Sequence, residues 1–459
     1  MSEGGSSYLG SWYSWGGNML SNAVQSVSSL IGFDLDVVDP DADSSKKADG
    51  ASTNNGLYVQ ERQQVWGTKQ FQQYIGADVT NLLSVPVFIM EPFTILQKAA
   101  EIMEYTDLLD KADSTADMYE RFALVAAYCV SPFGAAERAW KPFNPILGET
   151  FECDGINGVK YLAEQVSHHP PVCAAHAQNA HFFYDLVSAP TTKFLGNSLE
   201  VYPYGRTRIT LRSSGEVFSL VPPNAKVHNI VLGRTWVDAA GTMSIQCPTT
   251  GCYCTLEFKP CGWFSYGRYE FKGYVYDKDG VPRILVSGLW NAHVDTVPCD
   301  GQGNALPGEE VKRLWTCTPK PEDYYSFTTY AHKLNSSANI PLPLPSDSRR
   351  RSDRSKLAAG EMLAAGADKV KLEEMQRTER KERERLGDSW KPRWFNSVAS
   401  PELIKGELDT EKVPFWEFNG EWLKVPRTEM SDEEGLSVNG KGFCPWQYPH
   451  LHAQAAASQ

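Results

Sequence analysis

The chain has 459 residues, of which 42% are hydrophobic and 22% are charged, and these values are normal for a globular protein with a buried core. That length allows one large domain with appendages or several ordinary domains. The net charge of -12 disfavours binding to nucleic acids, because the neutralisation of phosphates by cations supplies most of that affinity.

The sequence carries no segment that predicts a membrane span or secretion. No stretch approaches the roughly 20 apolar residues that span a bilayer. The N-terminus lacks a basic region followed by an apolar core, which is the pattern of a secretory signal. The ten cysteines follow no regular framework, which suits reduced thiols in the cytosol. We therefore expect a soluble, cytoplasmic protein.

Residues 1–33 combine helical spacing with an unusual polar face. Bulky side chains recur at helical spacing at Tyr8, Leu9, Trp12, Trp15, Met19, Leu20, Ala23, Val24, Val27, Leu30 and Ile31. Ser, Gly, Asn and Gln fill the intervening positions, and Glu3 is the only charged residue before Phe33. An uncharged polar face is typical of helices that insert into loosely packed membranes, but a helix docked on its own domain fits equally well. Both interpretations stay open.

The next segments predict a linker, then a helical region and then a region of strands. Residues 34–56 are acidic and polar and predict a flexible linker. Residues from about 92 to 140 show helical spacing and predict about two or three helices. From about 150 to 315, short runs rich in β-branched and aromatic residues alternate with turn residues, which predicts an antiparallel sheet or barrel. We expect this sheet to close, because closure removes exposed edges.

The last third of the chain predicts a helix and a tail. Charged residues run from Arg349 to Arg385 and predict a long exposed helix. This helix belongs to a C-terminal helical part at about 347–395. Residues 427–459 predict a loosely ordered tail, although Phe443, Trp446 and Tyr448 are able to pack.

Two adjacent histidines, His168 and His169, precede two prolines. Because prolines stop a helix, we expect the histidines at a strand end or turn. They are structural histidines bonded to the backbone, or metal ligands with Cys173 and His176, or donors that clamp a phosphate. The spacing fits no common zinc pattern, so we expect no metal.

Two other segments carry cations that suit a phosphate. Lys141 and Asn144 lie in a loop that prolines make rigid, where the ammonium and the amide are able to meet an anion or a hydroxyl. On the late helix, Lys369, Glu373 and Arg377 recur at i, i+4 spacing and share one face. Without other information, that face is typical of a solvated helix surface.

These segments resemble the motifs of a known family. Glu164–Pro171 reads Glu-Gln-Val-Ser-His-His-Pro-Pro and matches the fingerprint of the oxysterol-binding proteins, and Lys141–Glu149 matches a second motif of that family. The likeness extends from about Trp66 to Trp422, with further matches at Ile75–Thr80, Val85–Val87, Glu91–Pro92, His228–Gly233 and Asp368–Arg380. The chain resembles a short-form member without a pleckstrin-homology domain.

The resemblance implies an α+β fold. A large, near-complete antiparallel β-barrel encloses an apolar tunnel, with an N-terminal lid and helices and a C-terminal helical subdomain. The lipid-binding domain is expected at 57–426, with the lid at about 66–90. The lid residues expected to cover the bound lipid are Asp78, Val79, Thr80, Leu82, Leu83 and Val85.

The resemblance also implies a function without catalysis. Members of this family extract one lipid and carry it between membranes, and many exchange a sterol or phosphatidylserine for phosphatidylinositol 4-phosphate. We expect a bound lipid, no cofactor, and a sterol as the second ligand, with phosphatidylserine as the alternative. A lipid sensor is a further alternative, and a metal-dependent hydrolase is the enzyme alternative.

The expected partners and places of action also follow from the family. We expect transient, peripheral contact with membranes, at contacts of the endoplasmic reticulum with the Golgi or the plasma membrane. A docking protein on the endoplasmic reticulum is a candidate partner. However, the usual acidic two-phenylalanine motif for that docking is not clearly present, and Gly32–Asp36 matches it only weakly.

Carried over residue by residue, the resemblance assigns a headgroup site. His168 and His169 hold the inositol phosphate, with help from Lys141 and Asn144. From the late helix, the residues that close over the headgroup are Lys369, Glu373 and Arg377. The resemblance thus favours a binding face over a solvated face for that helix.

Overall fold

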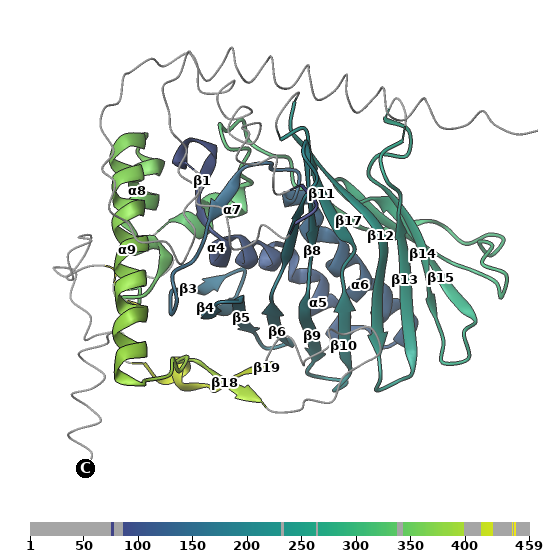
Figure 1. The fold of residues 1–459 in the computed structure, drawn as a ribbon. Coiled ribbons are helices and arrows are strands. Elements are labelled where there is room, and N and C mark those ends of the chain that lie inside the picture. Colours follow the sequence, from purple (N-terminus) through teal and green to yellow (C-terminus); the bar gives the residue numbers. More distant parts are fainter. Residues whose placement is uncertain are drawn as a thin grey trace, which may run out of the picture.

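The computed structural model describes residues 75–77, 86–230, 234–262, 265–336, 343–398, 415–425, 443 and 445–446. The predicted membrane-sensing segment 1–33, the linker 34–56 and the lid residues Asp78–Val85 lie outside these ranges. Within them, short N-terminal helices precede a large antiparallel sheet, and further helices follow it (Figure 1). No helix in the described ranges has both the length and the apolar character needed to cross a membrane.

Polar side chains fix where the N-terminal helices begin. Thr94 and Gln97 form a capping box, in which each side chain accepts a hydrogen bond from the other residue's backbone N–H. Asp117 accepts from the N–H groups of Tyr119 and Glu120. The elements of this region are η2 (Val87–Ile89), β1 (Met90–Thr94), α4 (Ile95–Ala100), η3 (Glu101–Tyr105), α5 (Asp107–Ser114), α6 (Met118–Val130), η4 (Ser131–Ala135) and β2 (Lys141–Phe143).

One 15-stranded sheet forms the centre of the molecule. Its main path runs β17-β16-β15-β14-β13-β12-β10-β9-β6-β5-β4-β3, and β11, β8 and β7 branch from it. The strands are β3 (Thr150–Ile156), β4 (Val159–His168), β5 (Pro171–Gln178), β6 (Phe182–Ser188), β7 (Thr191–Phe194), β8 (Ser198–Tyr202), β9 (Gly205–Leu211), β10 (Val217–Val221), β11 (Asn224–His228), β12 (Trp236–Cys247), β13 (Cys252–Phe258), β14 (Glu270–Tyr276), β15 (Pro282–Leu289), β16 (His293–Pro298) and β17 (Lys312–Thr316). Thus the predicted large antiparallel sheet is confirmed.

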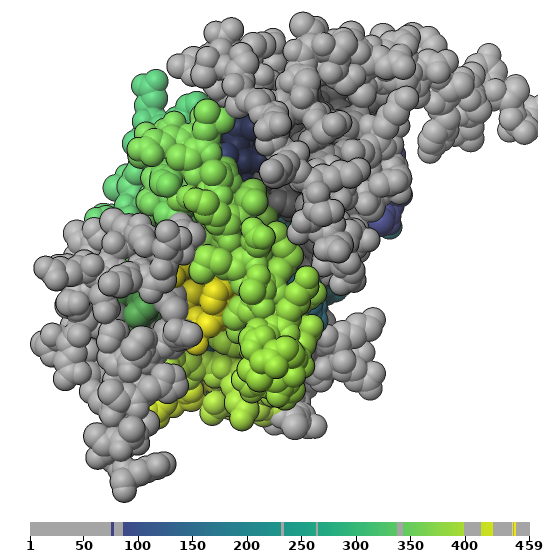
Figure 2. All heavy atoms as spheres, turned by 60° about the vertical axis from the view of Figure 1, so that its left-hand side comes forward, coloured from purple at the N-terminus to yellow at the C-terminus, as the bar shows by residue number. Residues whose placement is uncertain are grey.

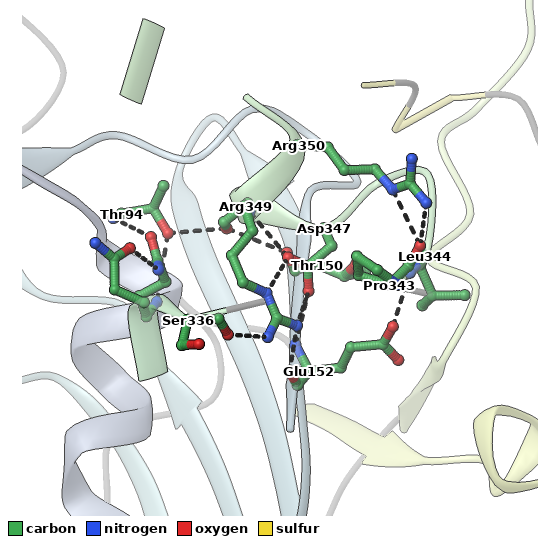
Figure 3. A network of polar contacts seen from close by, with 12 residues as sticks. Thr94, Thr150, Glu152, Ser336, Pro343, Leu344, Asp347, Arg349 and Arg350 are labelled. Atoms are coloured by element: carbon green, nitrogen blue, oxygen red, sulfur yellow. Dashed lines mark hydrogen bonds and ion pairs between the residues drawn. The ribbon is translucent and has the colours of Figure 1, made fainter. Parts of the chain in front are cut away.

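The expected closure of the sheet is wrong. Among the described strands, β3 and β17 form the two ends of the path and do not pair with each other. The β3 edge is instead covered by a later segment, in which the carbonyl of Ser346 accepts from Thr150 N. In the same segment, Arg349 donates to the carbonyl of Glu152 (Figure 3). Asp347 also accepts from the Glu152 N–H. Because this segment satisfies the edge, the strand does not need a partner across the gap.

The main core lies between the helices and the sheet. Helix α6 packs on β14 to β17, and α5 packs on β6 and β9, as the ribbon in Figure 1 shows. Phe122 and Phe218 meet edge to face across this boundary, with ring centroids 5.0 Å apart. The cluster continues with the fully buried Val125 and Ile245.

The C-terminal part differs from the single exposed helix that the charge pattern predicts. The charged run forms η7 (Ser348–Arg350), α8 (Ser352–Ala358) and α9 (Met362–Leu386), with Gly360 in the left-handed conformation between the two α-helices. Helix α9 also has a buried face, which includes Lys369 and Leu372. The elements β18 (Phe395–Val398), β19 (Phe415–Phe418) and η8 (Glu421–Lys424) follow.

Candidate functional site

The loop after β2 is held in place by buried charges. The Glu149 carboxylate accepts from the Ile146 N–H at 2.8 Å and from the Arg351 guanidinium at 2.9 Å. Arg351 also donates to the carbonyl of Asn144 at 2.9 Å. The Glu149 carbonyl accepts from the Gln165 N–H, which ties the loop to β4. The loop is therefore held both by Arg351 and by β4, the strand that ends at His168.

Lys141 and Asn144 form the first half of the candidate site. The Lys141 ammonium donates to Asn144 Oδ1 at 2.7 Å. Burial and the nearby charge of Lys369 lower the pKa of Lys141 to about 7, while Glu373 acts in the opposite direction. Lys369 itself bridges to Glu373 at 2.6 Å. A bound anion near Lys141 would favour its charged form and so raise its pKa again.

The histidine pair forms the second half. Strand β4 ends at His168 and β5 begins at Pro171, so the pair lies at the hairpin turn that the prolines predict. The two imidazole rings are 4.9 Å apart and nearly perpendicular. Burial, and then the charges of His169 and Arg380, lower the pKa of His168 to about 4. Its buried Nδ1 has no hydrogen-bond partner among the described residues.

Helix α9 joins the two halves of the site. Lys369 lies near Lys141, and Gln376 accepts from the Leu147 N–H at 3.0 Å. Further along the helix, the charge of Arg380 reaches His168. These positions share one helix face by their i, i+3 and i, i+4 spacing. In Figure 1, α9 stands beside the β3–β5 end of the sheet.

The structure therefore gathers the predicted site residues along α9. Lys141, Asn144, Lys369 and Glu373 form one group, and His168 and His169 lie with Arg380 in the other. The half-buried Arg377 lies on α9 between Glu373 and Arg380. Lys369 is 7% exposed, so the face is not solvated at this position, whereas Glu373 and Arg377 are half-buried.

Three residues of this arrangement were not predicted from the sequence. Gln376 and Arg380 continue the face of Lys369 at helical spacing, and that spacing is a signal that points to them. Arg351 has no such signal, because it is separated from its partners Asn144 and Glu149 by about half of the chain. Only the fold brings it to the loop.

Two described residues of the predicted lid, Gly76 and Ala77, lie against β7. Gly76 donates to the carbonyl of Phe194 at 2.6 Å, and Ala77 accepts from the Phe194 N–H at 3.2 Å. The lid residues expected to cover the lipid lie outside the described residues, namely Asp78, Val79, Thr80, Leu82, Leu83 and Val85. Their role stays a prediction.

His176 and Cys173, which were candidate metal ligands, have surroundings that do not suit a metal site. His176 Nδ1 pairs with Asp185 at 2.7 Å, and its ring stacks on Phe418 with centroids 4.2 Å apart. Burial raises the pKa of the Cys173 thiol to about 12, which opposes a metal-bound thiolate. Within the described part of the chain, no three His, Cys, Asp or Glu side chains are grouped as metal ligands.

Comparisons with known proteins support one family. The family model described as oxysterol-binding protein matches residues 66–426. The oxysterol-binding protein-related protein 3B of Arabidopsis thaliana is 44% identical over 453 residues, which cover 98% of this chain and 97% of that protein. The Osh1 ORD domain in complex with ergosterol has a TM-score of 0.71 at 29% identity, covering 91% of this chain and 98% of that chain.

A further solved structure is similar over a smaller part. The Osh3 ORD in complex with PI(4)P from Saccharomyces cerevisiae has a TM-score of 0.60 at 27% identity, and the match covers 69% of this chain and 83% of that chain. The matched residues 66–426 contain β4 with His168, β2 with the loop that follows it, and α9. The chain belongs to the oxysterol-binding protein family.

Proposed function

We propose that this protein binds a sterol and phosphatidylinositol 4-phosphate and exchanges them between membranes without catalysis. The observation that carries the proposal is the convergence of Lys141, Lys369, His168 and Arg380 along one face of α9. Clustered cations and imidazoles suit a phosphate monoester, which offers several charged acceptor oxygens. The relatives in complex with ergosterol and with PI(4)P support both ligands.

The physical basis of exchange is competition for one site. A lipid in water exposes its hydrocarbon surface at a cost of about 25 cal/mol per Å², so a carrier must enclose it. A sterol has no charged headgroup, and it does not use the cations along α9. Two lipids that share an apolar enclosure but differ in their headgroups then displace each other according to their concentrations in the two membranes. The protein acts by peripheral, transient contact with membranes such as those of the endoplasmic reticulum, Golgi and plasma membrane.

A two-liposome assay tests this function. Donor vesicles contain a fluorescent sterol and acceptor vesicles contain phosphatidylinositol 4-phosphate. We expect the protein to move the sterol forward and the phosphoinositide backward, with each flow faster when the other lipid is present. Sterol transfer that does not respond to the phosphoinositide contradicts exchange. If phosphatidylserine replaces the sterol in the donor vesicles and its transfer responds to the phosphoinositide instead, phosphatidylserine is the second ligand.

The lowered pKa of Lys141 predicts a pH dependence of headgroup binding. Below about pH 7 Lys141 is already protonated, whereas above it the bound phosphate must restore the proton. The affinity should therefore fall as the pH rises above 7, by up to roughly tenfold per pH unit. The phosphate has a second pKa near 6, so its own charge is nearly constant in this range.

The matched control is Lys141→Arg, whose guanidinium stays charged throughout this pH range. We expect this variant to keep a nearly constant affinity from pH 7 to about pH 9. The measurement is extraction of phosphatidylinositol 4-phosphate from liposomes at graded pH. Parallel profiles for the wild type and the variant would assign the pH dependence to another group.

A further inference from the structure

The described C-terminal residues Phe443, Pro445 and Trp446, here named the C-terminal anchor, lie against the candidate site. Phe443 is 4% exposed and forms a buried cluster with Ile146 of the loop and Leu372 of α9, and Trp446 packs on this cluster. Figure 2 shows the yellow C-terminal atoms against the green surface of α9. The anchor therefore joins α9 to the loop that follows Lys141 and contains Asn144.

The loop passes close to the anchor at Gly148. This glycine has a φ of +77°, and a Cβ added to it would lie 2.6 Å from a Trp390 ring carbon and 2.9 Å from the Pro445 carbonyl oxygen. Any side chain there would collide with both neighbours. The absence of a Cβ thus lets Trp390 and the anchor pack directly on the loop backbone.

The second half of α9 is less buried than its first half. The buried residues of α9 are Ala365, Asp368, Lys369 and Leu372, all in its first half. Arg377 and Arg380 lie beyond them. In that second half, Gln376 accepts from the Leu147 N–H, Arg383 lies over the Trp390 ring at 5.5 Å, and Trp446 lines a shallow groove along the helix.

We propose that the C-terminal anchor is a positioning element that holds the second half of α9 on the loop and so places Arg377 and Arg380 for a phosphate headgroup. The anchor does not touch the ligand in this proposal. The choice of a phosphate headgroup as the ligand rests on the proposed function, but the placement of α9 is measurable without any lipid. A sterol, which lacks a phosphate, does not require this placement.

The test compares lipid uptake by the full chain and by three variants, Phe443→Ala, Trp446→Ala and Phe443→Leu. We expect the two alanine variants to extract phosphatidylinositol 4-phosphate roughly tenfold less well, because the apolar cluster loses an aromatic ring. Sterol uptake from liposomes should stay near the wild-type value. Phe443→Leu keeps most of the apolar volume and should recover much of the extraction. Leu423→Ala, at an exposed side chain, is the control and should match the wild type.

Sterol uptake also reports folding. Equal loss of both lipids in Trp446→Ala and in Phe443→Leu overturns the proposal, because it assigns the anchor to general stability. Unchanged phosphoinositide extraction in both alanine variants overturns it as well. If Phe443→Ala does not fold, Trp446→Ala and Phe443→Leu carry the comparison.

Amide hydrogen exchange without lipid separates this inference from the proposed function. In Trp446→Ala we expect faster exchange in residues 373–386 than in the wild type, with little change in residues 362–368, which precede the contact of the anchor at Leu372. Equal exchange of 373–386 in the two proteins refutes the positioning role. A wild-type protein that extracts no phosphoinositide refutes the proposed function instead.

Discussion

Replacing both histidines, His168→Ala with His169→Ala, should nearly abolish extraction of phosphatidylinositol 4-phosphate from liposomes. A hydrogen bond to a charged group contributes about 1.5–3 kcal/mol, so the loss of two corresponds to roughly a hundredfold or more in affinity. The variant should still fold, because His168 Nδ1 is buried without a hydrogen-bond partner among the described residues. Its removal therefore relieves an unsatisfied polar atom.

The control for this prediction is His332→Ala, at a histidine whose side chain is 50% exposed. Sterol uptake and thermal unfolding show whether the double variant keeps its fold. If it extracts the phosphoinositide as well as the wild type does, the histidines do not bind the headgroup. A loss of sterol uptake of the same size would assign the pair to the structure of the β4–β5 turn.

The positions of the histidines and of α9 show how far local patterns reach. The prolines after His169 predict a strand end or turn, and β4 indeed ends at His168. The i, i+4 spacing of Lys369 and Glu373 predicts a shared face, and they are bridged at 2.6 Å. Both features depend on neighbours in sequence, which is why the sequence alone reveals them.

The covering of the β3 edge and the fixation of the loop lie beyond local patterns. Thr150 N bonds to the carbonyl of Ser346, and Leu147 N bonds to Gln376, so each pairing joins segments far apart in the chain. The periodicity of apolar and charged residues gives no information on hydrogen bonds between segments that are far apart in the chain. The break in the charged run was open to prediction, since Gly360 is a residue that ends helices. The charge pattern points to the same place, because Glu361 is the only charged residue in 357–367.

Arg351→Met should be the most destabilising of these substitutions. Arg351 bonds to Glu149 at 2.9 Å and to Asp353 at 2.7 Å, and both carboxylate side chains have an exposed fraction of 0%. Removing the cation leaves two buried carboxylates without this partner, and such a loss costs about 3–5 kcal/mol. Denaturant unfolding of the variant and the wild type measures the difference. Arg385→Met, in an exposed pair with Glu382, should leave stability nearly unchanged.

The pH dependence of this loss tests its cause. Burial already raises the pKa of Glu149 above its usual value, although Arg351 opposes that effect. Without Arg351 the pKa rises further, so the folded variant binds more protons than the unfolded chain above the unfolded pKa. Its stability deficit should therefore shrink as the pH falls from about 8 to about 5. A deficit that stays constant across this range would instead indicate lost packing and a lost bond to Asn144, because neither depends on a titrating carboxylate.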